Sequence, residues 1–226
     1  MLRSTLLTLL SFPLLVFSQV WSNHTVAYSD VKGTSPYQRH ECAAGLCQFG
    51  GNDYCIVVGG RGNFNKKCPI IYDRAKDSLY LGNQCPQEVH HFQASVWRDS
   101  IIVVGMALTN GYPGENPVSS LYLYHAKTDT WEVKTTIPTS RRRGSAQSVI
   151  VGDWVYFFNG ITQGHISGWV NQADRYNLTT NTWEVLLPTP RARDHALAFH
   201  VGENIYLVGG RRSNYGNAGG LHGLPV

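Results

Sequence analysis

The chain has 226 residues, of which 42% are hydrophobic, 12% aromatic and 15% charged, a composition that supplies a packed core and excludes a wholly disordered protein. Its net charge of +4 is too small for the concentrated basic face of a nucleic-acid-binding domain, so we expect no nucleic acid among its partners. The 23 glycines and 10 prolines favour many short strands joined by turns over long helices.

The N-terminal segment is apolar from Thr5 to Phe17 and follows a single positive residue, Arg3. This pattern is typical of a secretory signal peptide, whereas a membrane-spanning helix needs roughly 20 apolar residues. We therefore predict a signal peptide over residues 1–22, an N-terminal extension over 23–42, and a secreted protein without a membrane span. The alternative is a buried N-terminal strand or helix of the folded domain.

All five cysteines lie between residues 42 and 85. Their spacings match no zinc-binding pattern, so no metal site is predicted. In an oxidising compartment this cluster predicts up to two disulfides, with one thiol left over because the number is odd. The candidates are Cys42, Cys47, Cys55, Cys68 and Cys85. Two N-x-S/T sequons, at Asn23 and Asn177, are predicted glycosylation sites in an exported chain.

Two stretches separated by 52 residues carry the same pattern, so that Tyr124 and Trp131 align with Tyr176 and Trp183. Each stretch continues to a proline, an arginine and two short strands. The last of these strands ends in a glycine pair or a variant of one. These strand ends fall at Gly60, Met106, Gly160 and Gly210, which are 46, 54 and 50 residues apart.

A period near 50 residues, a strand-closing double glycine and a spaced Tyr/Trp pair resemble the kelch repeat of β-propellers. The resemblance covers about residues 43–210 and implies an all-β propeller of four-stranded antiparallel blades over residues 43–226. It implies that the glycines end strands where no Cβ fits and that the aromatic residues pack between blades. The repeat positions are Gly59, Gly60, Tyr124, Trp131, Gly160, Tyr176, Trp183, Gly209 and Gly210.

Assigning strands to the repeats gives about three and a half blades, whereas closed propellers have four to eight. The expected strands are 44–49, 53–58, 69–73 and 77–81 in the first blade; 91–97, 100–105, 121–125 and 130–134 in the second; 144–151, 154–159, 173–177 and 181–186 in the third; and 194–201 with 204–209 in a fourth. We favour a partial or truncated propeller, and the alternative is completion of one ring by two chains.

Ligand binding is expected at the end of the blades where long loops emerge. If the strands of a blade are lettered a to d, the b–c and d–a connections leave the sheet at the same end, and 106–120 and 160–172 are long b–c loops. The candidate ligand contacts are Tyr112, Arg142, Arg143, His165, Trp169 and Arg193. The alternative is that these arginines brace the backbone or are solvated, and that the tryptophan caps the strands. Asn177 falls at the opposite end.

The sequence contains none of the common catalytic motifs, so we expect a secreted kelch-repeat module that binds an extracellular protein or glycan. The resemblance also includes galactose oxidases and sugar epimerases, which makes a carbohydrate-active enzyme the alternative. The oxidases' copper ligands, tyrosines and histidines with a cysteine–tyrosine cross-link, cannot be mapped onto this chain. No catalytic residue, cofactor or metal is therefore predicted, and the enzymatic question stays open with a non-enzymatic role favoured.

Overall fold

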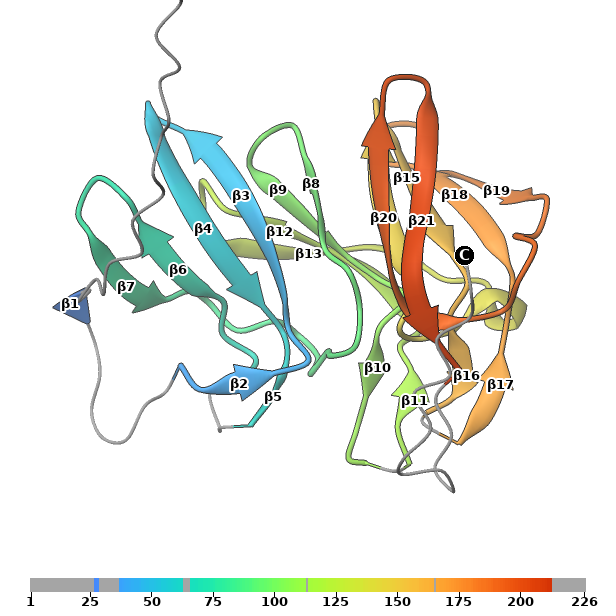
Figure 1. The fold of residues 1–226 in the computed structure, drawn as a ribbon. Helices are drawn as coiled ribbons and strands as arrows, with labels where there is room; N and C mark the ends of the chain where they lie inside the picture. The colour runs from blue at the N-terminus through green and yellow to red at the C-terminus, as the bar shows by residue number, and fades with distance from the viewer. Residues whose placement is uncertain (1–26, 29–36, 63–65, 113, 165, 213–226) are drawn as a thin grey trace, which may run out of the picture.

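A computed structural model describes residues 27–28, 37–62, 66–112, 114–164 and 166–212 of the chain (Figure 1). The predicted signal peptide and Asn23 lie outside these residues. The described part is almost entirely β-structure, and its single helical segment is a short 3-10 turn, η1 (Thr139–Arg141). No helix in it has the length and apolar character that a membrane crossing requires.

Three sheets form the blades, and we call them blades 1, 2 and 3. Blade 1 contains β3 (Ala43–Phe49), β4 (Asn52–Val58), β6 (Ile70–Asp73) and β7 (Ser78–Leu81), with β1 (Ala27–Tyr28) added in parallel to β7. Blade 2 contains β8 (Ser95–Trp97), β9 (Ile101–Val104), β12 (Ser120–His125) and β13 (Thr130–Thr136). Blade 3 contains β14 (Gln147–Val151), β15 (Trp154–Phe158), β18 (Ala173–Asn177) and β19 (Thr182–Leu186). The expected all-β fold of four-stranded antiparallel blades is confirmed.

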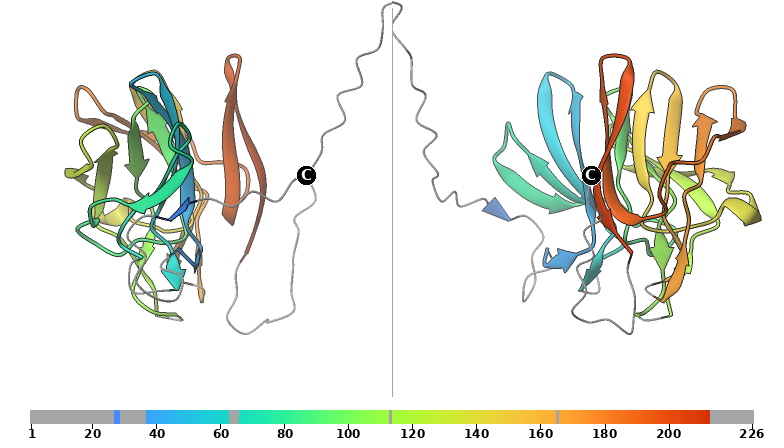
Figure 2. Two further views of the ribbon diagram at one scale, coloured as in Figure 1. Left: turned by 90° about the vertical axis from the view of Figure 1, so that its left-hand side faces the viewer. Right: turned by 45° about the vertical axis from the view of Figure 1, so that its right-hand side comes forward.

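A hairpin of β20 (Asp194–Val201) and β21 (Asn204–Arg211) follows blade 3 and stands beside it (Figure 2). Three short antiparallel strand pairs lie at the opposite end of the sheets from the β3–β4, β8–β9 and β20–β21 turns (Figure 1). They are β2 (Arg39–His40) with β5 (Arg61–Gly62), β10 (Leu108–Thr109) with β11 (Asn116–Pro117), and β16 (Ile161–Gln163) with β17 (Ser167–Trp169). This is the end at which the sequence places the long b–c loops.

Two apolar clusters hold the blades together. Tyr124 lies fully buried between blades 1 and 2, and Tyr176 and Phe157 lie between blades 2 and 3. Trp131 and Trp183 pack beside Tyr124 and Tyr176, with ring centroids 4.9 Å and 5.7 Å apart. Each tyrosine hydroxyl also donates a hydrogen bond to the c–d turn five residues later, Tyr124 to Asp129 at 2.7 Å and Tyr176 to Asn181 at 3.0 Å. The repeated tyrosine therefore serves both the core and its own turn.

The strand-closing pairs take backbone angles that favour glycine. Gly59 and Gly60 have φ of +64° and +103°, and Asn159 and Gly160 have +55° and +120°. A Cβ atom on Gly160 would lie 2.7 Å from the carbonyl oxygen of Gly144, so the chain passes too close there for any side chain.

Two first strands begin later than predicted, at Ser95 rather than residue 91 and at Gln147 rather than residue 144. The N–H groups of His91 and Ser145, which precede these strands, bond to the preceding unit and not to their own first two strands. His91 and Ser145 have φ of +53° and +51°, which breaks the extended backbone at these points.

All five cysteines are free thiols in the structure, so the predicted disulfides are not present. The pleat of blade 1 explains one missing pair. Leu46, not Cys47, lies opposite Cys55, so the two cysteines point to opposite faces of the sheet. Burial raises the pKa of the Cys47 and Cys85 thiols to about 11, which keeps both protonated and unreactive.

The predicted glycosylation site Asn177 has a buried side chain. This side chain is buried at the end of β18, where its Oδ1 accepts hydrogen bonds from the backbone N–H groups of Thr179 and Thr180 at 2.9 Å and 2.8 Å. The amide thus caps the turn that the sequon occupies. An N-linked glycan would attach to Nδ2 of the same amide, and the burial of this side chain restricts the space for it.

Candidate functional site

One residue near the start of the first strand of each unit occupies an equivalent position, and we call these four the blade-start residues. They are Glu41, His91, Ser145 and His195, with φ of +59°, +53°, +51° and +53°. Backbone hydrogen bonds link them in order: His91 N–H to Glu41 O at 3.0 Å, Ser145 N–H to His91 O at 2.8 Å, and His195 N–H to Ser145 O at 3.2 Å. Each unit thereby places one side chain at the common axis.

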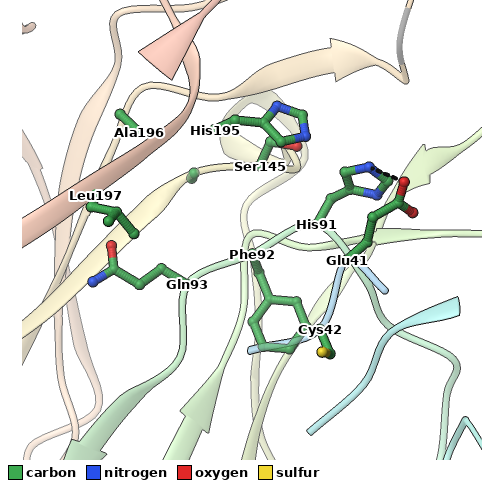
Figure 3. A pocket seen from close by; sticks show the side chains of 10 residues that line it. Glu41, Cys42, His91, Phe92, Gln93, Ser145, His195, Ala196 and Leu197 are labelled. Carbon is green, nitrogen blue, oxygen red and sulfur yellow. Dashed lines mark ion pairs between the residues drawn. The ribbon is translucent and has the colours of Figure 1, made fainter. Parts of the chain in front are cut away.

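The four side chains meet at one cavity of about 190 Å³ (Figure 3). Phe92, Ala146 and Ala196 supply its apolar wall, and the blade-start residues supply most of its polar groups. This volume is well below the roughly 300–1,000 Å³ of pockets for drug-sized ligands. The cavity therefore suits one side chain or a comparably small group.

Ser145 has an unsatisfied hydroxyl at this cavity. The residue is 3% exposed, and its Oγ has no hydrogen-bond partner. A buried polar atom without a partner is uncommon in folded proteins and costs about 1–3 kcal/mol. A bound group that offers a hydrogen-bond acceptor or donor to Oγ would recover that free energy.

His90 and His91 contact each other at the edge of the cavity. Their Nδ1 atoms lie 2.6 Å apart. The outer nitrogens face oxygen atoms: His90 Nε2 lies 3.0 Å from the carbonyl oxygen of Asn110, and His91 Nε2 lies 3.1 Å from Glu41 Oε1. Burial lowers the pKa of His90.

Glu41 lies between His91 and Arg61. Its Oε2 lies 3.2 Å from a guanidinium nitrogen of Arg61, which also contacts the buried Glu115 at 2.9 Å. Burial raises the pKa of Glu41, but the hydrogen bond and charge of His91, together with the charge of Arg61, outweigh it and lower the pKa to about 2. Arg61 also lies 5.8 Å from the ring of Tyr112, so the network extends from the cavity to the exposed loops.

His195 forms a second pair. Its Nδ1 lies 2.6 Å from Oδ2 of the buried Asp194, and its ring meets that of His91 edge-on at 5.0 Å. The carboxylate fixes the orientation of the imidazole, so His195 presents a defined edge to the cavity.

Glu41, His90 and His91 also offer three atoms within 4.8 Å of one another, as a metal site would. However, His91 turns opposite ring nitrogens to its two partners, an arrangement that shares protons rather than converging lone pairs on one point.

No family model matches the chain. It is 29% identical over 136 residues to the Kelch-like protein terF of Aspergillus terreus, covering 58% of this chain and 29% of that protein. It is 30% identical over 192 residues to Kelch-like protein 36 of Rattus norvegicus, covering 80% of this chain and 28% of that protein. The chain thus spans less than a third of either relative's length. A solved structure, that of YjhT, superimposes with a TM-score of 0.62 at 16% identity, covering 76% of this chain and 59% of the other.

The chain belongs to the kelch-repeat family. Both the sequence relatives and the shared fold support this assignment, and the four-stranded blades are the units that the repeat predicts. The match extends the family's repeat architecture to this chain and leaves its ligand to be argued from the site itself.

Two of the predicted ligand-binding arginines have structural roles in this kelch domain. Arg143 is completely buried: its Nε donates to the carbonyl of Asn159, and its guanidinium lies 2.8 Å from Asp174 Oδ2. Arg193 donates to the carbonyl of Gly209 at 2.8 Å. Each arginine thus braces the first residue of a strand-closing pair. Burial leaves Arg143 no surface for a ligand, so it is withdrawn from the candidates.

The other predicted contacts are dispersed. Tyr112 is exposed beside Arg61 and so borders the cavity network. Arg142 is half-buried and donates from Nε to the carbonyl of Ile137 at 3.0 Å. Trp169 is half-buried on β17, and its buried Nε1 has no hydrogen-bond partner. His165 lies outside the described residues.

The sequence contains a signal for the blade-start residues in the arginines that precede them. Three of them stand two positions after an arginine that contacts a strand-closing pair. Arg39 precedes Glu41 in this way, and its guanidinium donates to the carbonyl of Gly59 at 3.0 Å. Arg143 and Arg193 precede Ser145 and His195. Aligning these arginines would have located the site.

Glu41 gives a pH-dependent prediction. Because its folded pKa is lowered from 4.5 to about 2, its stabilisation is present above pH 4.5 and is lost as the pH falls through about 2. Glu41→Gln should lower the free energy of unfolding by roughly 2 kcal/mol near neutral pH, allowing for partial exposure. The difference should shrink towards zero near pH 2, as measured by urea denaturation across that range.

Glu203→Gln, at the exposed β20–β21 turn, is the matched control and should change stability little at any pH. A Glu41→Gln deficit of the same size at neutral and acid pH would contradict the ion-pair assignment.

Proposed function

We propose that this kelch-repeat chain is a secreted interaction module that binds an extracellular protein at the loop end, with one partner side chain entering the cavity. The observation that carries the proposal is the unpartnered Ser145 hydroxyl at the cavity where four units converge. An acceptor group on the inserted side chain would satisfy it, while Phe92 and Ala146 would enclose the apolar part of that side chain.

The surroundings of the cavity support a protein ligand. The β2–β5, β10–β11 and β16–β17 strand pairs lie at the same end of the blades (Figure 1). Tyr112 and Ile166 are exposed in these loops, and tyrosine is frequent at protein-binding hot spots. A glycan is the alternative ligand, because the exposed Tyr112 ring would also stack on a sugar. The size of the cavity favours a single protruding side chain over a sugar chain.

Selection of a displayed random-peptide library on the folded chain tests this proposal. Ser145→Ala and Tyr112→Ala should each weaken binding of the selected peptides roughly tenfold, because each removes one contact worth about 1–1.5 kcal/mol. Lys127→Ala, in the exposed β12–β13 turn at the opposite end, should leave binding unchanged. Peptides that bind all three variants equally would show that the cavity is not the binding site.

Secretion is part of the proposal and rests on the apolar segment after Arg3. Its test is N-terminal sequencing of the protein recovered from the culture medium of the producing cells. A mature chain that begins near residue 23 would support export. Retention of the full N-terminus inside the cell would oppose it.

A carbohydrate-active enzyme is the second candidate, and the Asp194–His195 pair beside Ser145 is the observation that favours it. A carboxylate-oriented imidazole at a cavity can transfer a proton. Turnover of sugars or sugar alcohols, including copper-dependent peroxide release, is the assay. Activity that His195→Gln abolishes would favour this candidate over simple binding.

A further inference from the structure

We propose that the open face of the β20–β21 hairpin binds the outer face of blade 1 in a second copy of this chain, so that two copies close head to tail. The two faces belong to opposite ends of the same arc of blades. Their pairing would repeat the type of interface that joins successive units within the chain.

The open face of the hairpin is apolar. Leu197, Phe199 and Val201 alternate along β20 with residues that pack on blade 3, and Tyr206 and Val208 lie opposite them on β21. These five side chains are between 45% and 62% exposed. The register pairs Leu197 with Val208 and Phe199 with Tyr206, so the side chains form one continuous stripe. Soluble monomers rarely leave such a stripe uncovered.

The outer face of blade 1 is the second uncovered surface. Leu46 is 61% exposed, and Ala44 and Cys55 beside it are exposed too. The opposite face is covered: a Cβ atom on Gly45 would lie 2.7 Å from a methyl group of Val96 in blade 2. Blade 1 therefore offers small apolar side chains on its outer face, against which the bulkier hairpin stripe can pack.

The repeat shows that these faces are complementary halves. The residue six positions after each blade-start residue faces the next blade. Cys47 lies in the apolar cluster between blades 1 and 2, and Trp97 lies in the cluster between blades 2 and 3. Val201 is the equivalent residue of the hairpin. The residue five positions after each blade-start residue faces the preceding blade, as Val96 and Ile150 do. Leu46 is its equivalent in blade 1.

Each copy carries one open hairpin face and one outer face of blade 1, so two copies can cover all four of these faces at once. A head-to-tail interface of this kind either closes or grows into a filament, and closure of two copies leaves neither half exposed. In this proposal a second copy occupies the hairpin face and is seated through Leu46 and its neighbours.

Sedimentation equilibrium of the full chain at micromolar concentration tests the proposal, with the mass of two chains expected. Phe199→Asp and Leu46→Arg, made separately, should each raise the dimer dissociation constant roughly 100-fold, because each places a charge in an apolar interface. Val185→Asp, at another exposed apolar position on β19, is the matched control and should dimerise like the parent chain. Circular dichroism should show all three variants folded.

Mixing the two defective variants separates head-to-tail pairing from other modes. A mixed pair keeps one unaltered hairpin against one unaltered blade 1, and the altered halves meet as aspartate and arginine. Mixing should therefore restore dimers. A monomeric parent chain, a Leu46→Arg variant that still dimerises, or no recovery on mixing would each overturn the proposal. Dimerisation that depends on Phe199 alone would point to hairpin-to-hairpin pairing.

Discussion

Replacing Arg143 with methionine is expected to lower the free energy of unfolding by about 3–5 kcal/mol. Arg143 and Asp174 are both completely buried and face each other at 2.8 Å, so the substitution leaves a carboxylate in the interior with one of its two cations missing. Burial lowers the pKa of Arg143 to about 10, but the group remains charged near neutral pH. Urea denaturation followed by far-ultraviolet circular dichroism measures the loss.

Arg142→Met is the matched control, because this half-buried neighbour makes no ion pair within the described residues, and its loss should cost less than about 1 kcal/mol. The double variant Arg143→Met with Asp174→Asn should recover part of the loss, since it removes the uncompensated charge. Equal stability of the Arg143→Met and Arg142→Met variants would contradict a structural ion pair and return Arg143 to the ligand candidates.

Truncation of Phe157 to alanine is expected to cost about 3–5 kcal/mol. Its ring is buried between blades 2 and 3 and stacks on Trp183 with centroids 6.2 Å apart. Removing it opens a void at an interface between two blades. Because each blade of a repeat protein is stabilised mainly by its neighbours, blade 3 and the Ser145 that it positions should loosen first. Hydrogen exchange of the blade 3 amides should therefore accelerate more than that of blade 1.

Phe158→Ala provides the comparison, since Phe158 is the adjacent residue on the same strand and is only half-buried. Its cost should be clearly smaller. If both truncations lower the free energy of unfolding equally, or if exchange accelerates uniformly in all blades, blade 3 does not loosen separately from the other blades.

The fold could be predicted because its signal repeats along the chain. Tyr124 and Trp131 match Tyr176 and Trp183 in type and spacing, and packing between blades requires those residue types. The site could not be found in this way. Its four positions share a backbone conformation and hold glutamate, histidine, serine and histidine, so a comparison of residue types shows no repeat.

Two predictions from the sequence differ from the structure. Arg143 was predicted to contact a ligand because it lies on a d–a connection at the loop end, but it is buried against Asp174, which lies on β18 of the same blade. Disulfides were predicted from the number of cysteines, yet Cys47 and Cys55 point to opposite faces of one sheet. In both cases the outcome depends on contacts between residues of different elements, and spacing along the sequence alone does not give those contacts.

The hydrogen bonds that join the blade-start residues run from backbone to backbone. These bonds do not depend on which side chain stands at each position, although Glu41 Oε1 and His91 Nε2, 3.1 Å apart, also join two units through side chains. Recognition chemistry can therefore change at positions 41, 91, 145 and 195 while the backbone connection between units is kept. Positive φ limits the choice mildly, at about 1–2 kcal/mol for most residue types. The stability cost of such a change is set by the side-chain contacts that it removes, which for Glu41 are the ion pairs with His91 and Arg61.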